Sequence, residues 1–208
     1  MTRALRTEQP LWESFKRQSI QQAVIQLMFR DGLDAVTMER VAQEAGIAKG
    51  TVYLHYRDKQ ELLEEVKESA LAPMVAKLDE TFRSDAAPDR KLEVYCHRYL
   101  AYFDERRDLF RILLYEREVT RVQGKRYRGD RYRHLVEGVA KVIADGIADG
   151  TFRDISEPRS VAAMFVEANF AMLNQRLLTD HPRPFEDDAQ LIADVFLRGL
   201  KAEKRRKR

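Results

Sequence analysis

Cysteine is nearly absent from this sequence, because Cys96 is the only one among 208 residues. A single thiol excludes an intrachain disulfide framework and a cysteine-rich metal site, and it is typical of a reducing compartment. Glycine and proline are also scarce, at nine and six residues, which argues against a turn-rich β-sandwich or barrel. We therefore expect a cytoplasmic, helix-rich protein without disulfides.

Long hydrophobic runs are missing as well. The longest apolar stretch, residues 161–173, contains Glu167 and Asn169, so it is too short and too polar to span a membrane. The first thirteen residues lack the apolar segment of a secretory signal. We expect no membrane association.

Catalytic and metal-ligating patterns are absent too. The four histidines, at positions 55, 97, 134 and 181, show no metal-ligand spacing. No nucleophile or acid–base pair can be assembled around His55. The expectation is a protein that is not an enzyme, with no catalytic residue, no metal and no cofactor.

Charge is unevenly distributed along the chain. The overall net charge is +3, yet residues 61–200 are net acidic, while residues 1–60 and 201–208 are net basic. This distribution indicates that any surface for a polyanion is local. The basic tail, residues 201–208, has two interpretations, a solubilising segment or part of a surface that binds a polyanion.

Apolar residues recur at helical spacing almost throughout. The first stripe consists of Ile20, Ala23, Val24, Leu27 and Met28. No stretch alternates long enough to predict a strand. The pattern predicts an all-α chain of about nine helices, of which the first three are short and end near Tyr56. Pro73 is expected to end or kink the helix that Asp58 and Glu61 begin as a capping box.

Residues 37–59 carry the strongest motif. Thr37 can cap a short helix, Gly46 supplies a turn, and a second short helix follows over residues 48–55, which together indicate a helix-turn-helix. At 100° per residue, Ala48, Val52 and Tyr56 should point inward. The outward face consists of Gly50, Thr51, Tyr53 and Leu54. Such a face is unusual for a solvated helix and suits the DNA major groove.

The spacing of these residues resembles the DNA-binding domain of the TetR family of bacterial transcriptional regulators. The matching motifs are R-x-x-I-x-x-A at 17–23, L-M-F-R-D-G at 27–32 and T-M-x-x-V-A-x-x-A-G-I-A-K-G-T-V-Y-x-H-Y at 37–56. The resemblance implies a DNA-binding domain over 14–74, with the helix-turn-helix at about 37–56, and a ligand-binding and dimerisation domain over 75–208. It further implies DNA contacts by Thr37, Lys49, Gly50, Thr51, Tyr53, Leu54, His55 and Lys59. Ala48 departs from the serine common in the family and removes a helix cap.

The region beyond residue 75 is less informative. The helix over 159–178 is apolar on more than one face, so with the helix over 186–201 it could form half of an intersubunit four-helix bundle; the alternative is the core of a monomer. Residues that could line an effector cavity are Tyr95, Tyr99, Phe103, Phe110, Tyr132, Phe165, Asn169 and Met172. A stripe of this kind also suits an ordinary core.

Residues 117–133 contain seven Arg and Lys residues against two acids. They form either a solvated loop or a portal for an anionic head group. The leading hypothesis is a homodimeric repressor that binds a palindromic site on double-stranded DNA and is released by a small hydrophobic effector, with an anionic head as an open possibility. The alternative is an architectural DNA-binding protein without an effector, and an all-α enzyme is a distant third.

Overall fold

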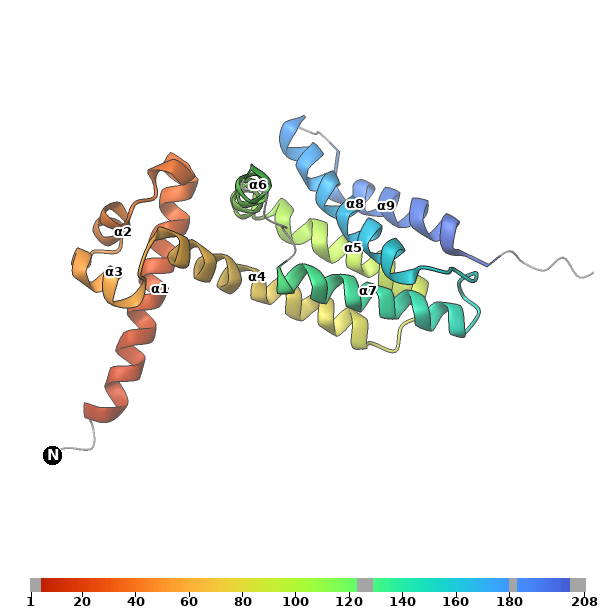
Figure 1. Cartoon of the computed structure of the whole chain (residues 1–208), viewed down its shortest axis with the longest axis horizontal. Coiled ribbons are helices and arrows are strands. Elements are labelled where there is room, and N and C mark those ends of the chain that lie inside the picture. The colour runs from red at the N-terminus through yellow and green to blue at the C-terminus, as the bar shows by residue number, and fades with distance from the viewer. Residues whose placement is uncertain (1–4, 123–128, 180–182, 203–208) are drawn as a thin grey trace, which may run out of the picture. The chain divides into compact units, whose positions relative to one another are not determined.

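The computed structural model describes residues 5–122, 129–179 and 183–202, and this part of the chain is almost entirely α-helical (Figure 1). Its α-helices are α1 Leu5–Asp31, α2 Met38–Glu44, α3 Lys49–His55, α4 Lys59–Arg83, α5 Pro88–Asp104, α6 Arg107–Val122, α7 Asp130–Ala148, α8 Pro158–Leu178 and α9 Phe185–Leu200. A single 3₁₀ turn, η1, covers Leu33–Ala35. Within the described ranges, β pairing is limited to one bridge between Phe152 and Lys201. The all-α prediction is confirmed.

Internal contacts divide the chain into two compact units, residues 1–71 and 72–208. In the first unit, α1, α2 and α3 pack around apolar side chains that include Ile20, Val24 and Val41. Helix α4 begins in the first unit and ends in the second. Among the described helices, none combines the length and apolar character needed to cross a membrane.

Two expectations about helix length were wrong. Helix α1 is 27 residues long rather than short, because only its second half carries the apolar stripe that periodicity detects. Helix α4 continues past Pro73 to Arg83, so of the two expected effects of Pro73 the end of the helix is wrong. Proline removes a backbone donor and crowds the carbonyl four residues earlier. The burial of Met74 and Leu78 beyond it stabilises the helix against this cost.

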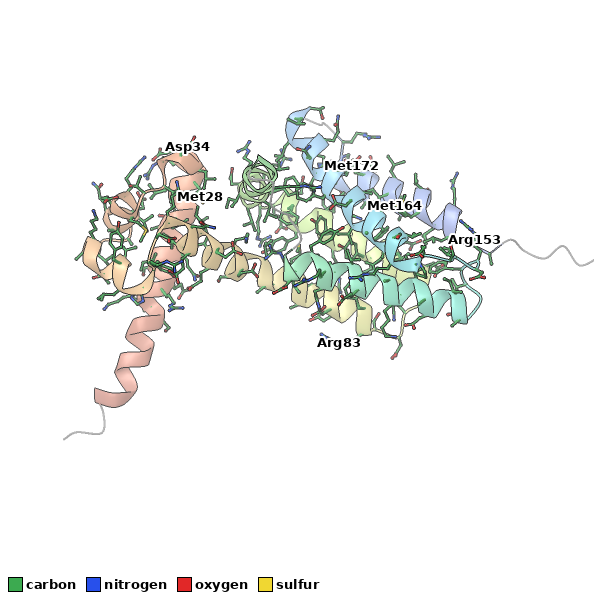
Figure 2. The ribbon with its side chains drawn as sticks, viewed as in Figure 1. Met28, Asp34, Arg83, Arg153, Met164 and Met172 are labelled. Carbon is green, nitrogen blue, oxygen red and sulfur yellow. The ribbon has the colours of Figure 1, made fainter. Side chains whose placement is uncertain are left out.

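The core of the second unit forms around α5, which contacts α7, α8 and α9. The stripe predicted on this helix is confirmed, because Leu92, Tyr95, Cys96, Tyr99 and Phe103 are all buried. Helix α8 is different, since its apolar residues are not all covered. In Figure 2, Met164 and Met172 both lie along α8; Met164 is exposed and Met172 is half-buried.

Candidate nucleic-acid interface and buried aromatic cluster

The helix-turn-helix is built by local interactions that the sequence predicts. Thr37 Oγ1 accepts a hydrogen bond from the Arg40 N–H at 3.2 Å and thereby caps α2. Gly46 has a φ of 67°, a left-handed conformation that favours glycine. Val41 of α2 and Val52 of α3 are fully buried. The two short helices are therefore fixed against the rest of the first unit.

Helix α3 presents most of its predicted outward face to solvent. Tyr53 and Leu54 are 45% and 85% exposed, Gly50 is exposed and Thr51 is half-buried. Val52 and Tyr56 point inward as expected. Ala48 does not, and that prediction was wrong: it is exposed because it precedes the helix in an extended conformation, φ −67° and ψ 142°, where helical geometry does not apply.

Gly50 is not required by packing inside the first unit. A Cβ atom added at this position would meet nothing within 4 Å, and its φ is not in the left-handed region. Glycine within a helix lowers stability by about 0.5–1 kcal/mol relative to alanine. Its presence here fits a surface that another molecule approaches closely.

Lys49 has partners on its own chain. Its ammonium forms an ion pair with Glu39 of α2 and lies 5.7 Å from the centre of the Tyr53 ring. The hydrogen bond with Glu39 raises the pKa of Lys49, so the side chain stays charged. A phosphate that binds Lys49 would have to compete with this exposed carboxylate.

Lys59 lies in the first turn of α4, where a lysine is often fully solvated, but here its side chain is bonded to the protein. Its Nζ donates to the Leu33 carbonyl oxygen at 3.0 Å, and the side chain is half-buried. This bond fixes the ammonium beside η1. A lysine ammonium has three donors, so the bond to Leu33 leaves further donors for an anion.

Glu65 of α4 connects several elements of the first unit, and sequence reasoning missed it. Its carboxylate accepts hydrogen bonds from Tyr56 Oη at 2.9 Å, Gln21 Nε2 at 3.0 Å and Arg17 Nη1 at 3.1 Å. Burial and the contact with this carboxylate raise the pKa of Tyr56. These contacts hold the end of α3 to α1 and α4, over sequence separations of up to 48 residues that local motifs do not reveal.

The residues predicted to line a cavity are mostly brought together in the second unit. Tyr95 and Tyr99 stack with centroids 5.8 Å apart, and Phe165 of α8 lies 5.3 Å from Tyr95. Phe103 joins this cluster to Phe110. Tyr95, Tyr99, Phe103, Phe110, Phe165 and Asn169 are buried, whereas Tyr132 and Met172 are half-buried. The cluster is tightly packed, and its assignment as an effector site stays a prediction.

Two polar atoms within this cluster lack hydrogen-bond partners in the described part of the chain, Tyr95 Oη and Asn169 Oδ1. Leaving a buried polar atom unpaired costs about 1–3 kcal/mol. Cys96 lies beside them, and burial raises the pKa of its thiol to about 12 against a smaller opposing effect of a hydrogen bond from Asn169. The thiol is therefore neutral at physiological pH.

A cavity of about 10 Å³ lies next to the cluster. It is lined by Phe103, Asp104, Arg107, Phe110, Leu173, Arg176 and Leu177. The volume suffices for about one water molecule. At its polar side, the buried Arg176 donates to Asp188 Oδ2 at 2.5 Å and to Asp104 Oδ1 at 3.0 Å, so its charge is compensated.

Of the basic segment 117–133, residues 123–128 lie outside the described ranges, as do residues 203–208 of the basic tail. Arg117 pairs with Glu167 at 2.8 Å and lies 4.5 Å from the centre of the Phe170 ring. Arg133 forms an ion pair with Asp130. No group of metal-ligating side chains occurs among the residues that the structure describes.

Comparison with known proteins matches both units. The sequence profile described as bacterial regulatory proteins, tetR family, matches residues 20–66. An uncharacterized helix-turn-helix transcriptional regulator of Bacillus subtilis, YfiR, is 24% identical over 88% of this chain and 91% of its own. The helix-turn-helix transcriptional repressor KstR2 of Mycolicibacterium smegmatis is 28% identical over 61% of this chain and 62% of its own.

Among solved structures, SmeT, the repressor of the Stenotrophomonas maltophilia multidrug efflux pump SmeDEF, superimposes with a TM-score of 0.74 at 20% identity. The alignment covers 90% of this chain and 91% of SmeT. At this identity, the match extends the likeness in fold from the helix-turn-helix to the second unit.

Proposed function

We infer that this chain, which belongs to the tetR family of bacterial regulatory proteins, acts as a ligand-controlled transcriptional repressor. The observation that carries the proposal is the outward face of α3. Its exposed Tyr53 and Leu54, together with the open Gly50, form a contact surface where a solvated helix would present charges. KstR2 and SmeT are both named as repressors, which supports repression over activation.

In this proposal, the side chains of α3 divide between bases and phosphates. Thr51, Tyr53, Leu54 and His55 would reach base edges or the backbone in the major groove, where Leu54 can contact a thymine methyl group. Lys49 would exchange Glu39 for a phosphate. Thr37 and Lys59 would bind phosphates, because the Thr37 hydroxyl accepts a bond from Arg40 and still has its own proton to donate.

The second unit supports a homodimer. Met164 and Leu178 on α8, and Leu191 and Val195 on α9, are exposed large apolar side chains on two helices that contact each other. The residues 164 and 178, like 191 and 195, fall within about 40° of each other around their helices. Exposed apolar side chains that share a face mark a protein contact, and a symmetric copy of the chain would cover them.

A dimer also suits the DNA-binding surface. Two recognition helices related by a twofold axis bind half-sites about 34–36 Å apart, so the operator would be palindromic. Light scattering should give about twice 24.3 kDa, and Val195→Asp should reduce this to the monomer mass. Ile25→Asp is the control, because Ile25 is a similarly exposed apolar residue on α1. A wild-type monomer would refute the model of two half-sites.

The effector in this proposal is a small apolar molecule that binds among the aromatic residues of the second unit. To release DNA, it must bind the DNA-incompetent conformation better by about 1–3 kcal/mol. The paired state of Arg117 and Arg133 offers no support for a free cationic portal, so we do not build an anionic head group into the proposal.

Selection of bound fragments from genomic DNA, followed by sequencing, tests the function directly. A repressor should enrich a palindromic site and keep it in an excess of bulk genomic DNA. Tyr53→Ala should abolish the enrichment, whereas the control Tyr102→Phe in α5 should not. Binding without any preferred sequence would instead favour the architectural alternative.

A further inference from the structure

The unpaired atoms Tyr95 Oη and Asn169 Oδ1 are unusual because both side chains are fully buried among aromatic rings. Buried polar groups in folded proteins are nearly always hydrogen-bonded, and an exception calls for a specific explanation. An apolar side chain at either position would avoid the loss of stability. These two polar side chains therefore indicate a role other than packing in the core.

The neighbours of Asn169 determine which kind of hydrogen-bonding group can pair with its side chain. Its Nδ2 donates to the Phe165 carbonyl oxygen at 2.9 Å. Reversing the amide would bring Oδ1 against that carbonyl, and two acceptors repel each other. The amide donor is thus engaged with Phe165, and Oδ1 is an acceptor that needs a donor.

Tyr95 is held as firmly as Asn169. Its ring lies 6.0 Å from Phe82, 5.8 Å from Tyr99 and 5.3 Å from Phe165, measured between centroids. These three rings prevent the side chain from turning its hydroxyl to solvent. Phe165 also joins the two residues, because its ring contacts Tyr95 and its carbonyl binds Asn169.

We propose that Tyr95 and Asn169 form the recognition centre for an uncharged hydroxyl group on an otherwise apolar effector. Such a hydroxyl can donate to Asn169 Oδ1, and a hydroxyl can equally donate to or accept from Tyr95 Oη. An ionised carboxylate can only accept hydrogen bonds, so it would be repelled by Oδ1. An ammonium would lose its hydration among aromatic rings without an opposite charge. The inference rests on the proposed function, because it specifies the effector class of that site.

The ligand must also create its own space. The cavity beside Phe103 and Leu173 measures about 10 Å³, far less than a molecule with a chain of several carbons. Tyr95 and Asn169 are fully buried among packed rings, so the binding of such a molecule at these residues requires α5 and α8 to separate. A ligand that fits only the expanded arrangement binds one conformation preferentially, which is the condition for shifting a conformational equilibrium.

The test compares three probes of matched size by calorimetry and thermal unfolding of the full-length protein. The first is 1-decanol, the second its isomer methyl nonyl ether, which cannot donate, and the third is decanoate. 1-Decanol should bind about tenfold or more tightly than the ether, as expected for one hydrogen bond, and decanoate should bind no better than the ether. Equal binding of the three, tightest binding of decanoate, or no binding of any probe would overturn the proposal.

Tyr95→Phe separates recognition from structure. The variant should bind 1-decanol as weakly as the ether, yet unfold at the wild-type temperature or slightly higher, because the lost hydroxyl has no partner. Tyr102→Phe, the same change on the same helix, should leave binding of 1-decanol unchanged. A clear fall in the unfolding temperature of Tyr95→Phe would show that the hydroxyl is already bonded and would refute the inference.

The proposed function can fail separately from this inference. If 1-decanol binds with the expected preference but does not release the selected DNA fragments, the hydroxyl site stands and effector control of DNA binding is wrong. If no palindromic fragment is enriched, the repressor function fails, while the comparison of 1-decanol with its ether remains decisive for the pair.

Discussion

Replacing Gly50 by alanine should stabilise the protein and weaken its binding to DNA. The residue lies near the start of α3, its side chain position is open, and its backbone is not in the left-handed region. Alanine restricts the unfolded chain and favours helix, so we expect a gain of about 0.5–1 kcal/mol in the free energy of unfolding. For a chain of this length, that gain raises the unfolding temperature by about 2 °C.

The methyl group that Gly50→Ala adds lies on the face of α3 that is proposed to approach DNA. If it prevents close contact of the backbone with the groove, affinity for the selected fragment should fall about tenfold, which corresponds to about 1.4 kcal/mol. Fluorescence anisotropy titrations measure the affinity, and calorimetric melting measures the stability. The opposite signs of the two changes matter, because a variant that merely damages the fold loses both.

Gly46→Ala is the matched control. Gly46 is also exposed, and a Cβ atom there would also meet nothing within 4 Å, but its φ is 67°. A left-handed conformation costs a residue with a Cβ about 1–2 kcal/mol, so this variant should unfold at a lower temperature. The reasoning is wrong if Gly50→Ala is destabilised like Gly46→Ala, or if it binds DNA with wild-type affinity.

Two further predictions concern Lys59 and Cys96. Lys59→Ala should lose about 1 kcal/mol of stability with its bond to Leu33 and reduce the slope of log affinity against log salt by about one unit; titrations at several salt concentrations that gave an unchanged slope would remove Lys59 from the interface. Since burial raises the pKa of Cys96 from 9.0 to about 12, the thiol ionises first in the unfolded chain, and its contribution to stability should be lost as pH rises from 9 to 12. Denaturant titrations at pH 8 and 11 should show a smaller loss for Cys96→Ala than for the wild type, and equal losses would contradict the assignment.

The helix-turn-helix could be predicted closely because it depends on local interactions. A threonine cap, a glycine in the left-handed region and an apolar spacing of three and four residues lie within 20 residues of one another, and each leaves a recognisable pattern. The capping box of α4 is similar: Glu61 N–H donates to Asp58 Oδ1 at 2.9 Å, and the Glu61 carboxylate accepts from the Arg57 N–H. The prediction that Ala48 points inward was wrong because it applied the helical angle of 100° per residue to a residue that precedes the helix.

Contacts between distant residues could not be predicted in the same way. Lys59 and Leu33 are 26 residues apart, and Arg17 and Glu65 are 48 apart. A lysine in a first helical turn has the same sequence signature whether it is solvated or bonded to a distant carbonyl. The length of α1 was missed for a related reason, because exposed helical residues such as Phe15 do not extend an apolar stripe.

The aromatic stripe of α5 shows where sequence patterns lose their power to distinguish function. A packed core and an effector site both require buried apolar residues at helical spacing, so Tyr95, Tyr99 and Phe103 satisfy either interpretation equally. What separates the two is the state of the polar atoms. A tyrosine hydroxyl in a core normally finds a partner, whereas one that awaits a ligand does not. The unpaired Tyr95 Oη and Asn169 Oδ1 are therefore the observation on which the proposed effector site depends, and no spacing rule contains it.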